Sequence, residues 1–246
     1  IIEEKLKEKV NSHLLSDAEI GFQLSGGIDS SLITLLADKK NKNINAYTIS
    51  FEDSVYDESK WAKEISYKSG IKYSQFTLKE EFVLEALDDC TWHLDQPLNH
   101  PNSIGLYLLG KRCPKETKVL LSGEGADEIF GGYPRFYYSN LLEEKKYAKN
   151  IFNYLPKPEI INNFYRKEIK NNQEFNISLS MYSSFDDLYK ILPSFKWENA
   201  ISNRLDLYPS KSSNLFLNHR IYEINTFLQD LLIRQDKMFM ASSIET

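Results

Sequence analysis

A short glycine-containing segment, Leu24-Ser25-Gly26-Gly27-Ile28-Asp29-Ser30-Ser31, constrains the fold of this chain more than any other feature. An apolar run from Glu19 to Leu24 leads into it and predicts a β-strand, and apolar residues at helical spacing follow it from Ile28 to Lys40. Two adjacent glycines allow the chain to turn sharply between these elements. A strand, a tight turn and a helix in this order predict the beginning of an α/β fold.

The same turn has the chemistry of a phosphate-binding loop. Consecutive amides of a glycine turn can point into one concavity, and the following helix adds its unpaired N-terminal amides and the positive end of its dipole. Ser25, Ser30 and Ser31 supply hydroxyl donors. Asp29 is a candidate magnesium ligand, because a carboxylate beside phosphate needs a cation between them. No Gly-Lys-Ser/Thr follows the glycines, so this is not a Walker A motif, and a serine-capped turn is the purely structural alternative.

Strands and helices alternate along the first half of the chain. This alternation predicts parallel strands joined by right-handed crossovers, and hence a doubly wound α/β sheet. We expect further strands at Asn45–Phe51, Ile71–Leu78 and Lys118–Leu121, and helices at 3–15, Tyr56–Lys68, Glu80–Leu94 and Asn102–Arg112. The glycine-rich turns after Leu24 and Leu121 would then lie at the carboxyl ends of parallel strands, the edge where ligands bind in open α/β sheets.

The pattern changes after Gly132. The stretch Tyr133–Ser213 is rich in Tyr, Phe, Lys and Asn and is interrupted by prolines, which predicts an irregular, mostly helical half. Asn218–Ala241 reads as one long helix with a broad apolar face, and we expect that face to pack in the core. The expected organisation is therefore an α/β core over 1–132 and a helical part over 133–246.

Composition excludes several classes of protein. Of the 246 residues 41% are hydrophobic, the net charge is -5, and the basic residues are scattered, so nucleic acid is not an expected partner. No apolar run approaches the roughly 20 residues that span a bilayer, so we expect no membrane span and a cytoplasmic location. Cys90 and Cys113 have no ligand spacing, which argues against a disulfide framework or a zinc site.

A second acidic segment follows the strand that ends at Leu121. In Ser122-Gly123-Glu124-Gly125-Ala126-Asp127-Glu128, three carboxylates fall within about one helical turn. Like charges so close need a cation or a proton. The alternative is an acidic helix N-terminus, where the dipole favours carboxylates.

These two segments, together with Arg234-Gln235-Asp236-Lys237-Met238 and the closing Ser243-Ile244-Glu245-Thr246, resemble the synthetase domain of glutamine-dependent asparagine synthetases. Tyr56-Asp57-Glu58-Ser59 and Leu94-Asp95-Gln96-Pro97 are also similar to that family. The resemblance runs from about Ala18 to the end, in the family's order. It implies a PP-loop ATP pyrophosphatase fold of the adenine nucleotide alpha-hydrolase type.

The resemblance also implies a reaction. ATP adenylates a carboxylate with release of pyrophosphate, and ammonia then displaces AMP, so ATP and Mg²⁺ are the expected cofactors. The Ser-Gly-Glu-Gly-Ala-Asp-Glu form favours aspartate as the acceptor. Alternatives are another carboxylate, as in β-lactam-forming or sugar-acid-amidating relatives, and a non-catalytic nucleotide-binding module.

The family's functional residues map onto positions of this chain. The resemblance implies a pyrophosphate loop of Ser25, Gly26, Gly27, Asp29 and Ser30, magnesium ligands Asp29 and Asp127, and an adenosine pocket of Leu24, Ile49, Ser122 and Gly123. Glu124 would act beside the acyl-adenylate and the incoming ammonia, and Arg234 would bind a carboxylate of the amino acid. Glu128 and Tyr133 match further family positions.

Two features of the family have no counterpart in this sequence. The glutaminase half, with its cysteine nucleophile, does not precede Ile1, so we expect no glutamine hydrolysis from this polypeptide. The ammonia would come from solution or from a glutaminase domain or subunit. A family lysine that contacts pyrophosphate would lie beyond Thr246.

Overall fold

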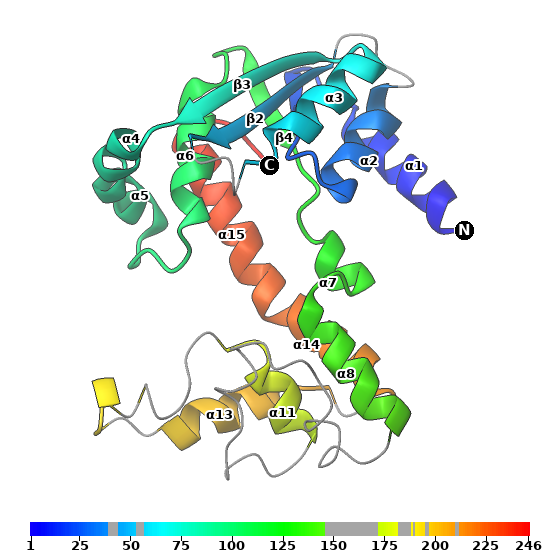
Figure 1. The fold of residues 1–246 in the computed structure, drawn as a ribbon, viewed down its shortest axis with the longest axis vertical. Coiled ribbons are helices and arrows are strands. Elements are labelled where there is room, and N and C mark those ends of the chain that lie inside the picture. Colours follow the sequence, from blue (N-terminus) through cyan, green and yellow to red (C-terminus); the bar gives the residue numbers. More distant parts are fainter. Residues whose placement is uncertain are drawn as a thin grey trace. The chain divides into compact units, whose positions relative to one another are not determined.

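The computed structural model describes residues 1–38, 44–52, 57–145, 172–181, 188, 190–194, 197–209 and 212–246. These residues form two compact units, one made of Ile1–Glu124 with Asp230–Thr246 and the other of Gly125–Gln229. The predicted division into 1–132 and 133–246 stays a prediction about domains. The carboxyl-terminal segment Asp230–Thr246 belongs to the first compact unit (Figure 1).

The first unit is built on a four-stranded parallel sheet. Its strands are β1 (Glu19–Gln23), β2 (Asn45–Phe51), β3 (Lys72–Leu78) and β4 (Thr117–Leu121), in the order β3-β2-β1-β4. Gly21 of β1 lies between Asn45 of β2 and Leu120 of β4 in the register. The chain moves outward from β1 to β3 and then returns across β1 to β4, so the switch point of the sheet lies between β1 and β4. The prediction of a doubly wound parallel sheet is confirmed.

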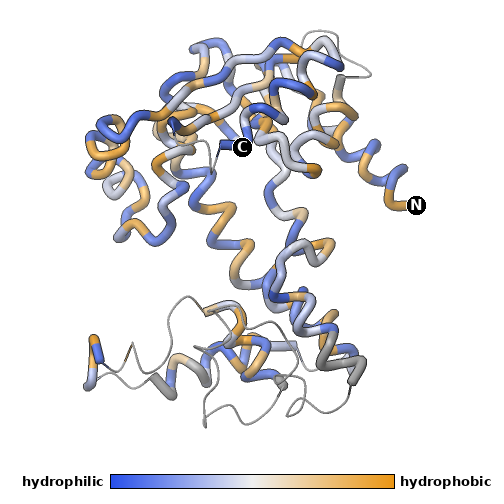
Figure 2. The backbone as a smooth tube through the Cα atoms, in the orientation of Figure 1, coloured by the Kyte–Doolittle hydropathy of each residue, from blue (hydrophilic) through white to orange (hydrophobic). Residues whose placement is uncertain are grey.

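Helices cover both faces of this sheet. They are α1 (Ile2–His13), α2 (Ile28–Asp38), α3 (Ser59–Ser69), α4 (Glu80–Glu85), α5 (Leu87–Leu94), α6 (Asn102–Arg112) and most of α15 (Phe227–Met240). Neighbouring strand residues point to opposite faces. Accordingly, Ala46 packs in one core with Ala37 and Ala62 of α2 and α3, whereas Tyr47 packs in another with residues of α6 and α15. Figure 2 shows apolar and polar stretches alternating along α15.

Two stretches that were each predicted as one continuous helix form two helices in the structure, so the prediction of a single helix was wrong in both cases. Glu80–Leu94 forms α4 and α5, and buried Ala86 (φ -83°, ψ -7°) lies between the two helices. The stretch predicted as Asn218–Ala241 forms α14 (Leu215–Asn225) and α15, with a break at Thr226 (φ -124°, ψ -74°). Thr226 is β-branched, and its hydroxyl donates to the carbonyl of Tyr222 at 2.7 Å.

A third helix begins later than predicted. The stretch Tyr56–Lys68 appears as α3, which starts at Ser59, while Tyr56 lies outside the described residues. Asp57 explains the start, since its carboxylate accepts from the backbone N–H of Ser59 at 3.1 Å and from the Ser59 hydroxyl at 2.8 Å. The end of the helix predicted over Ile28–Lys40 also lies outside the described residues beyond Asp38.

The second unit is mostly helical in its described part, as predicted. It contains α7 (Ala126–Phe130), α8 (Pro134–Lys145), α11 (Asn172–Ser178), α13 (Trp197–Asp206), α14 and the first residues of α15. Ile177, Tyr208 and Tyr222 form a buried apolar cluster in it. Much of the predicted irregular stretch Tyr133–Ser213 lies outside the described residues.

The end of the chain returns to the sheet. The backbone N–H of Leu120 donates to the carbonyl of Glu245 at 2.8 Å, and the N–H of Glu245 donates to the carbonyl of Lys118 at 2.8 Å. Glu245 thereby forms a parallel bridge with Val119 of β4. In the part of the chain that the structure describes, no helix is long and apolar enough to cross a membrane.

Candidate active site

The first glycine turn is held by hydrogen bonds among its own residues. The hydroxyls of Ser25 and Ser30 lie 2.9 Å apart, and the Ser30 hydroxyl also accepts from the backbone N–H of Ser25 at 3.2 Å. The Ser31 hydroxyl donates to the carbonyl of Gly27 at 2.6 Å. These bonds set the shape of the turn before any ligand arrives, and α2 begins directly after it at Ile28. The start of α2 offers the amides and the dipole that favour an anion.

Gly26 lets this turn approach the next helix. Its φ is +92°, and a Cβ added there would lie 2.7 Å from the backbone nitrogen of Ala62 and 2.9 Å from the Cβ of Trp61. Only glycine combines this backbone conformation with such a close approach. The turn is therefore supported from behind by the first residues of α3.

The second glycine-rich turn lies directly against the first. A Cβ added to Gly123 would lie 2.6 Å from the backbone nitrogen of Ser30 and 2.9 Å from the carbonyl carbon of Asp29. The turns after β1 and β4 thus meet backbone to backbone at the switch point of the sheet. The sequence predicted both turns at one edge of the sheet, and the structure brings them into contact.

A pocket of about 440 Å³ opens at this edge. Its lining comes from the carboxyl ends of three strands, from α6 and the residue before it, and from Glu58, Val83, Glu124 and Arg234. The predicted residues among them are Leu24, Ser25, Ile49, Glu124 and Arg234. The lining includes further residues that were not among the predicted site residues: Gln23, Thr48, Phe51, Glu58, Leu78, Val83, Pro101, Asn102, Ile104, Gly105, Leu106 and Leu109. Leu78 could have been found, because it ends β3 at the same edge as the predicted residues of β1 and β2.

The other predicted residues lie elsewhere. Gly26, Gly27, Asp29 and Ser30 form the first turn beside the pocket, and Ser122 and Gly123 form the second turn before Glu124; none of these lines the pocket. Asp127 belongs to the second unit, in the first turn of α7. The pairing of Asp29 with Asp127 around a metal therefore stays a prediction.

Arg234 is the most polar buried group of the pocket. Arg234 is only 4% exposed, and its Nη2 lies 3.9 Å from Oε1 of Glu124. Its Nε and Nη1 are buried and have no hydrogen-bond partner in the structure. A buried guanidinium is costly unless an anion accepts its hydrogen bonds, and its planar fork matches a carboxylate. The pocket thus offers a binding position for a carboxylate.

One face of α15 holds a loop near Arg234. Asp230, Arg234 and Lys237 share this face because they are spaced by four and three residues. Lys237 Nζ donates to the carbonyl of Leu94 at 2.9 Å and to Oδ2 of Asp95 at 2.8 Å, which lowers the pKa of Asp95. Further along the same loop, Asn99 donates to Asp230 at 3.1 Å. These contacts fix residues 94–99, which lead into Pro101 and Asn102 of the pocket wall.

His100 follows this loop and is sensitive to the same arginine. Burial lowers the pKa of His100, and the nearby positive charge of Arg234 lowers it further, against an opposing effect of Asp230. Both effects favour the neutral form of His100. Its Nδ1 is buried without a hydrogen-bond partner.

Among the described residues, no group of three or more His, Cys, Asp or Glu side chains is arranged to hold a metal by itself. A magnesium ion that arrives with a nucleotide needs less, because Mg²⁺ is usually held by one or two carboxylates together with substrate phosphates. Asp29, next to the phosphate-type turn, supplies a hard oxygen ligand of that kind. The donors present fit a nucleotide-bound magnesium ion.

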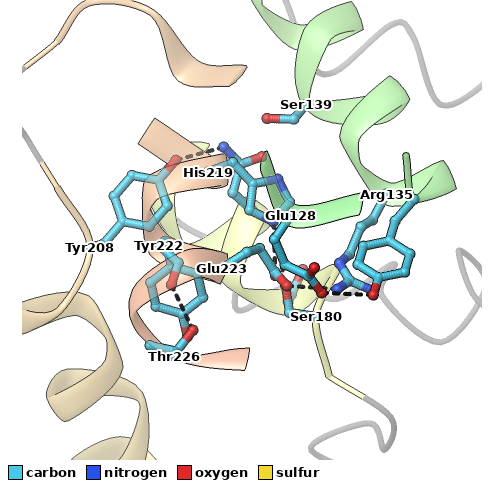
Figure 3. A network of polar contacts seen from close by, with 12 residues as sticks. Glu128, Arg135, Ser139, Ser180, Tyr208, His219, Tyr222, Glu223 and Thr226 are labelled. Atoms are coloured by element: carbon cyan, nitrogen blue, oxygen red, sulfur yellow. Dashed lines mark hydrogen bonds and ion pairs between the residues drawn. The ribbon is translucent and has the colours of Figure 1, made fainter. Parts of the chain in front are cut away.

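The second unit contains a buried polar network (Figure 3). Arg135 donates to Oε2 of Glu223 at 2.6 Å, the Ser180 hydroxyl donates to Oε1, and Nε2 of His219 lies 3.4 Å from Oε1. Burial would raise the pKa of Glu223, but the hydrogen bonds from His219 and Ser180 and the charge of Arg135 together lower it. Burial also lowers the pKa of His219. The network thus contains the Arg135–Glu223 ion pair, and burial favours the neutral form of the His219 imidazole.

Glu128 and Tyr133 belong to the same unit. Tyr133 donates to Oε1 of Glu128 at 2.7 Å, and the Glu128 residue has no exposed surface. Burial, this hydrogen bond and the nearby carboxylates raise the pKa of Tyr133. Both residues support the helices that follow the second turn.

Comparisons with known proteins agree with the motifs. The family model described as asparagine synthase matches residues 2–246. The chain is 29% identical over 255 residues to asparagine synthetase [glutamine-hydrolyzing] 1 of Bacillus subtilis, covering 99% of this chain and 40% of that protein. It is 31% identical over 163 residues to amidase chyE of Penicillium rubens, covering 60% of this chain and 24% of that protein. Among solved structures, NMN synthetase from Francisella tularensis aligns with a TM-score of 0.42 and 14% identity over 91% of this chain and 93% of that one.

Proposed function

Because the chain belongs to the asparagine synthase family, we propose that it carries out the ATP-dependent amidation of a carboxylate, with aspartate as the acceptor and an acyl-adenylate as the intermediate. The chain spans about 40% of the length of the Bacillus relative. One observation carries the proposal: a buried, incompletely hydrogen-bonded Arg234 lies beside Glu124 in a pocket that adjoins a phosphate-type turn.

The chemistry requires activation of the acceptor. A carboxylate does not react with ammonia at neutral pH, because oxide is too poor a leaving group. In the proposed reaction, a carboxylate oxygen attacks the α-phosphorus of ATP and pyrophosphate leaves. Ammonia then attacks the acyl carbon, the bond to AMP breaks, and the nitrogen loses one proton. A bound magnesium ion would neutralise charge on the phosphates.

The residues of the chain have separate tasks in this scheme. The turn of Ser25, Gly26 and Gly27, with the start of α2, holds the phosphates. The apolar lining around Leu24 and Ile49 accepts the adenosine. These groups act by orientation and by electrostatic stabilisation, the main sources of catalysis for a reaction of this kind.

Arg234 and Glu124 act at the other end of the pocket. Arg234 binds the carboxylate of the acceptor that is not adenylated. Glu124, beside it, takes the proton that ammonia releases as the carbon–nitrogen bond forms. Magnesium, a cytoplasmic location and a glutaminase domain or subunit as ammonia source are further parts of this proposal.

Pyrophosphate release tests the proposal directly. With ATP and magnesium present, we expect release only when aspartate is added, and asparagine only when ammonia is added as well. The Glu124→Gln variant should bind ATP as the wild type does but lose amide synthesis. Glu85→Gln, an exposed position on α4, is the matched control. Unchanged turnover in Glu124→Gln would refute the role of Glu124.

A second candidate function keeps the adenylation step but changes the acceptor, or replaces ammonia by an amine of the same substrate. The similarity to amidase chyE of Penicillium rubens covers 60% of this chain, which favours testing carboxylates other than aspartate, including those closed by an internal amine. The same assay with a panel of carboxylates separates these acceptors. ATP binding without adenylate formation on any acceptor would leave a nucleotide-binding module.

A further inference from the structure

Gln235 connects α15 to the turn that carries Glu124. Gln235 is only 3% exposed, and its Nε2 donates to the Ser122 hydroxyl at 3.0 Å. We propose that Gln235 is a positioning residue for Glu124 and acts through this hydroxyl. The inference rests on the proposed function in one respect, namely that Glu124 works at the reacting atoms.

The Ser122 hydroxyl serves two partners at once. Besides the bond from Gln235, it accepts from the backbone N–H of Glu124 at 3.3 Å. On another side of the same turn, Gly123 lies against the backbone of Ser30. Two neighbours thus restrain the turn: the first glycine turn, through backbone contact at Gly123, and α15, through the side chain of Gln235.

This fixation matters because of Arg234. Nη2 of Arg234 and Oε1 of Glu124 are 3.9 Å apart, whereas a hydrogen-bonded pair of these groups lies at about 2.7–2.9 Å. Opposite charges attract strongly in a half-buried pocket, so a loose turn would let Glu124 close on the guanidinium. Arg234 and Gln235 are consecutive on α15, so the same helical turn places the arginine and restrains the glutamate.

A filler role for Gln235 would have different consequences. A buried side chain that only occupies space should affect stability and both substrates alike when it is replaced. A positioning residue should change the use of the acceptor and leave nucleotide binding intact. The two roles can therefore be separated by experiment.

Amide hydrogen exchange followed by NMR tests the geometry without any assay of activity. In Gln235→Met, which keeps the length of the side chain, the Glu124 amide should exchange about fivefold faster or more, since one hydrogen bond restraining its acceptor is lost. Gln229→Met, at an exposed position of the same helix, should leave that rate unchanged. Equal exchange rates for the two variants would overturn the proposal.

Acceptor-dependent pyrophosphate release tests the consequence. Gln235→Met should lower kcat/KM for the acceptor about tenfold while the Kd for ATP stays within twofold of the wild type. Ser122→Ala should lower the acceptor kcat/KM as well, and the double variant should be no worse than the poorer single one. Wild-type acceptor use in Ser122→Ala, or losses that multiply in the double variant, would overturn the inference. A wild-type chain that releases no pyrophosphate would refute the proposed function instead, while hydrogen exchange would still decide the role of Gln235.

Discussion

Replacing Gly123 with alanine should separate the two glycine turns. The added Cβ would lie 2.6 Å from the backbone nitrogen of Ser30, and ordinary contact begins at 3.4 Å, so the turns must move apart by about 0.8 Å. The neighbouring atoms are backbone of the first turn of α2 and cannot rotate away. Overpacking of this kind costs about 1–3 kcal/mol of unfolding free energy. That loss corresponds to a fall in Tm of about 5 °C for a chain of this length.

The effect on function should exceed the effect on stability. A displacement near 1 Å between groups that must align can reduce turnover about 100-fold. Pyrophosphate release and thermal unfolding of Gly123→Ala measure the two effects on the same sample. Gly105→Ala is the control for stability, because no atom outside its own stretch of α6 lies within 4 Å of the added Cβ and alanine favours the helix. Wild-type Tm and turnover in Gly123→Ala would refute the close approach of the turns.

Three further predictions concern ionisable groups. Arg234→Lys should raise the KM for the acceptor about tenfold or more without changing ATP affinity, because lysine keeps the charge but loses the planar fork. An unchanged KM would mean that Arg234 does not bind the carboxylate of the acceptor. Glu223→Met should lower the free energy of unfolding in urea by about 3–5 kcal/mol, because the Arg135 charge loses its buried partner. The double variant with Arg135→Met should be more stable than Glu223→Met alone, and simple additivity of the two losses would contradict this reasoning. Burial lowers the pKa of His219 from its ordinary 6.5, so the unfolded chain binds the proton more tightly than the folded chain. The free energy of unfolding should therefore fall as the pH drops below about 6.5. His219→Gln should flatten this pH dependence, and identical pH profiles of the variant and the wild type would contradict the reasoning.

Local patterns were enough to predict the framework of the first unit. The strand Asn45–Phe51 and the helix Asn102–Arg112 have the predicted bounds, because turn-forming residues and prolines border them on the chain. The breaks at Ala86 and Thr226 were not predicted, since their backbone angles depend on packing that no local pattern reveals.

The site shows the same limit. The two glycine turns could be placed at one edge of the sheet, because that follows from strand order and direction alone. Glu58 lines the pocket, but its place there depends on how closely Gly26 approaches α3. The bond from Gln235 joins residues 113 positions apart, and the sequence contains no periodicity that links them. The roles of the predicted site residues stay predictions.

The position of α15 in the chain also bears on the order in which the protein is made. The turns after β1 and β4 leave the ribosome before α15, and Arg234, Gln235 and the bridge from Glu245 to β4 come from a segment synthesised more than 100 residues after the second turn. Domains generally acquire structure from the N-terminus during synthesis. A nascent chain lacking α15 would have the phosphate-type turn but neither the arginine nor the restraint on Glu124. In the proposed reaction, the acceptor site would therefore be complete only after α15 has been synthesised.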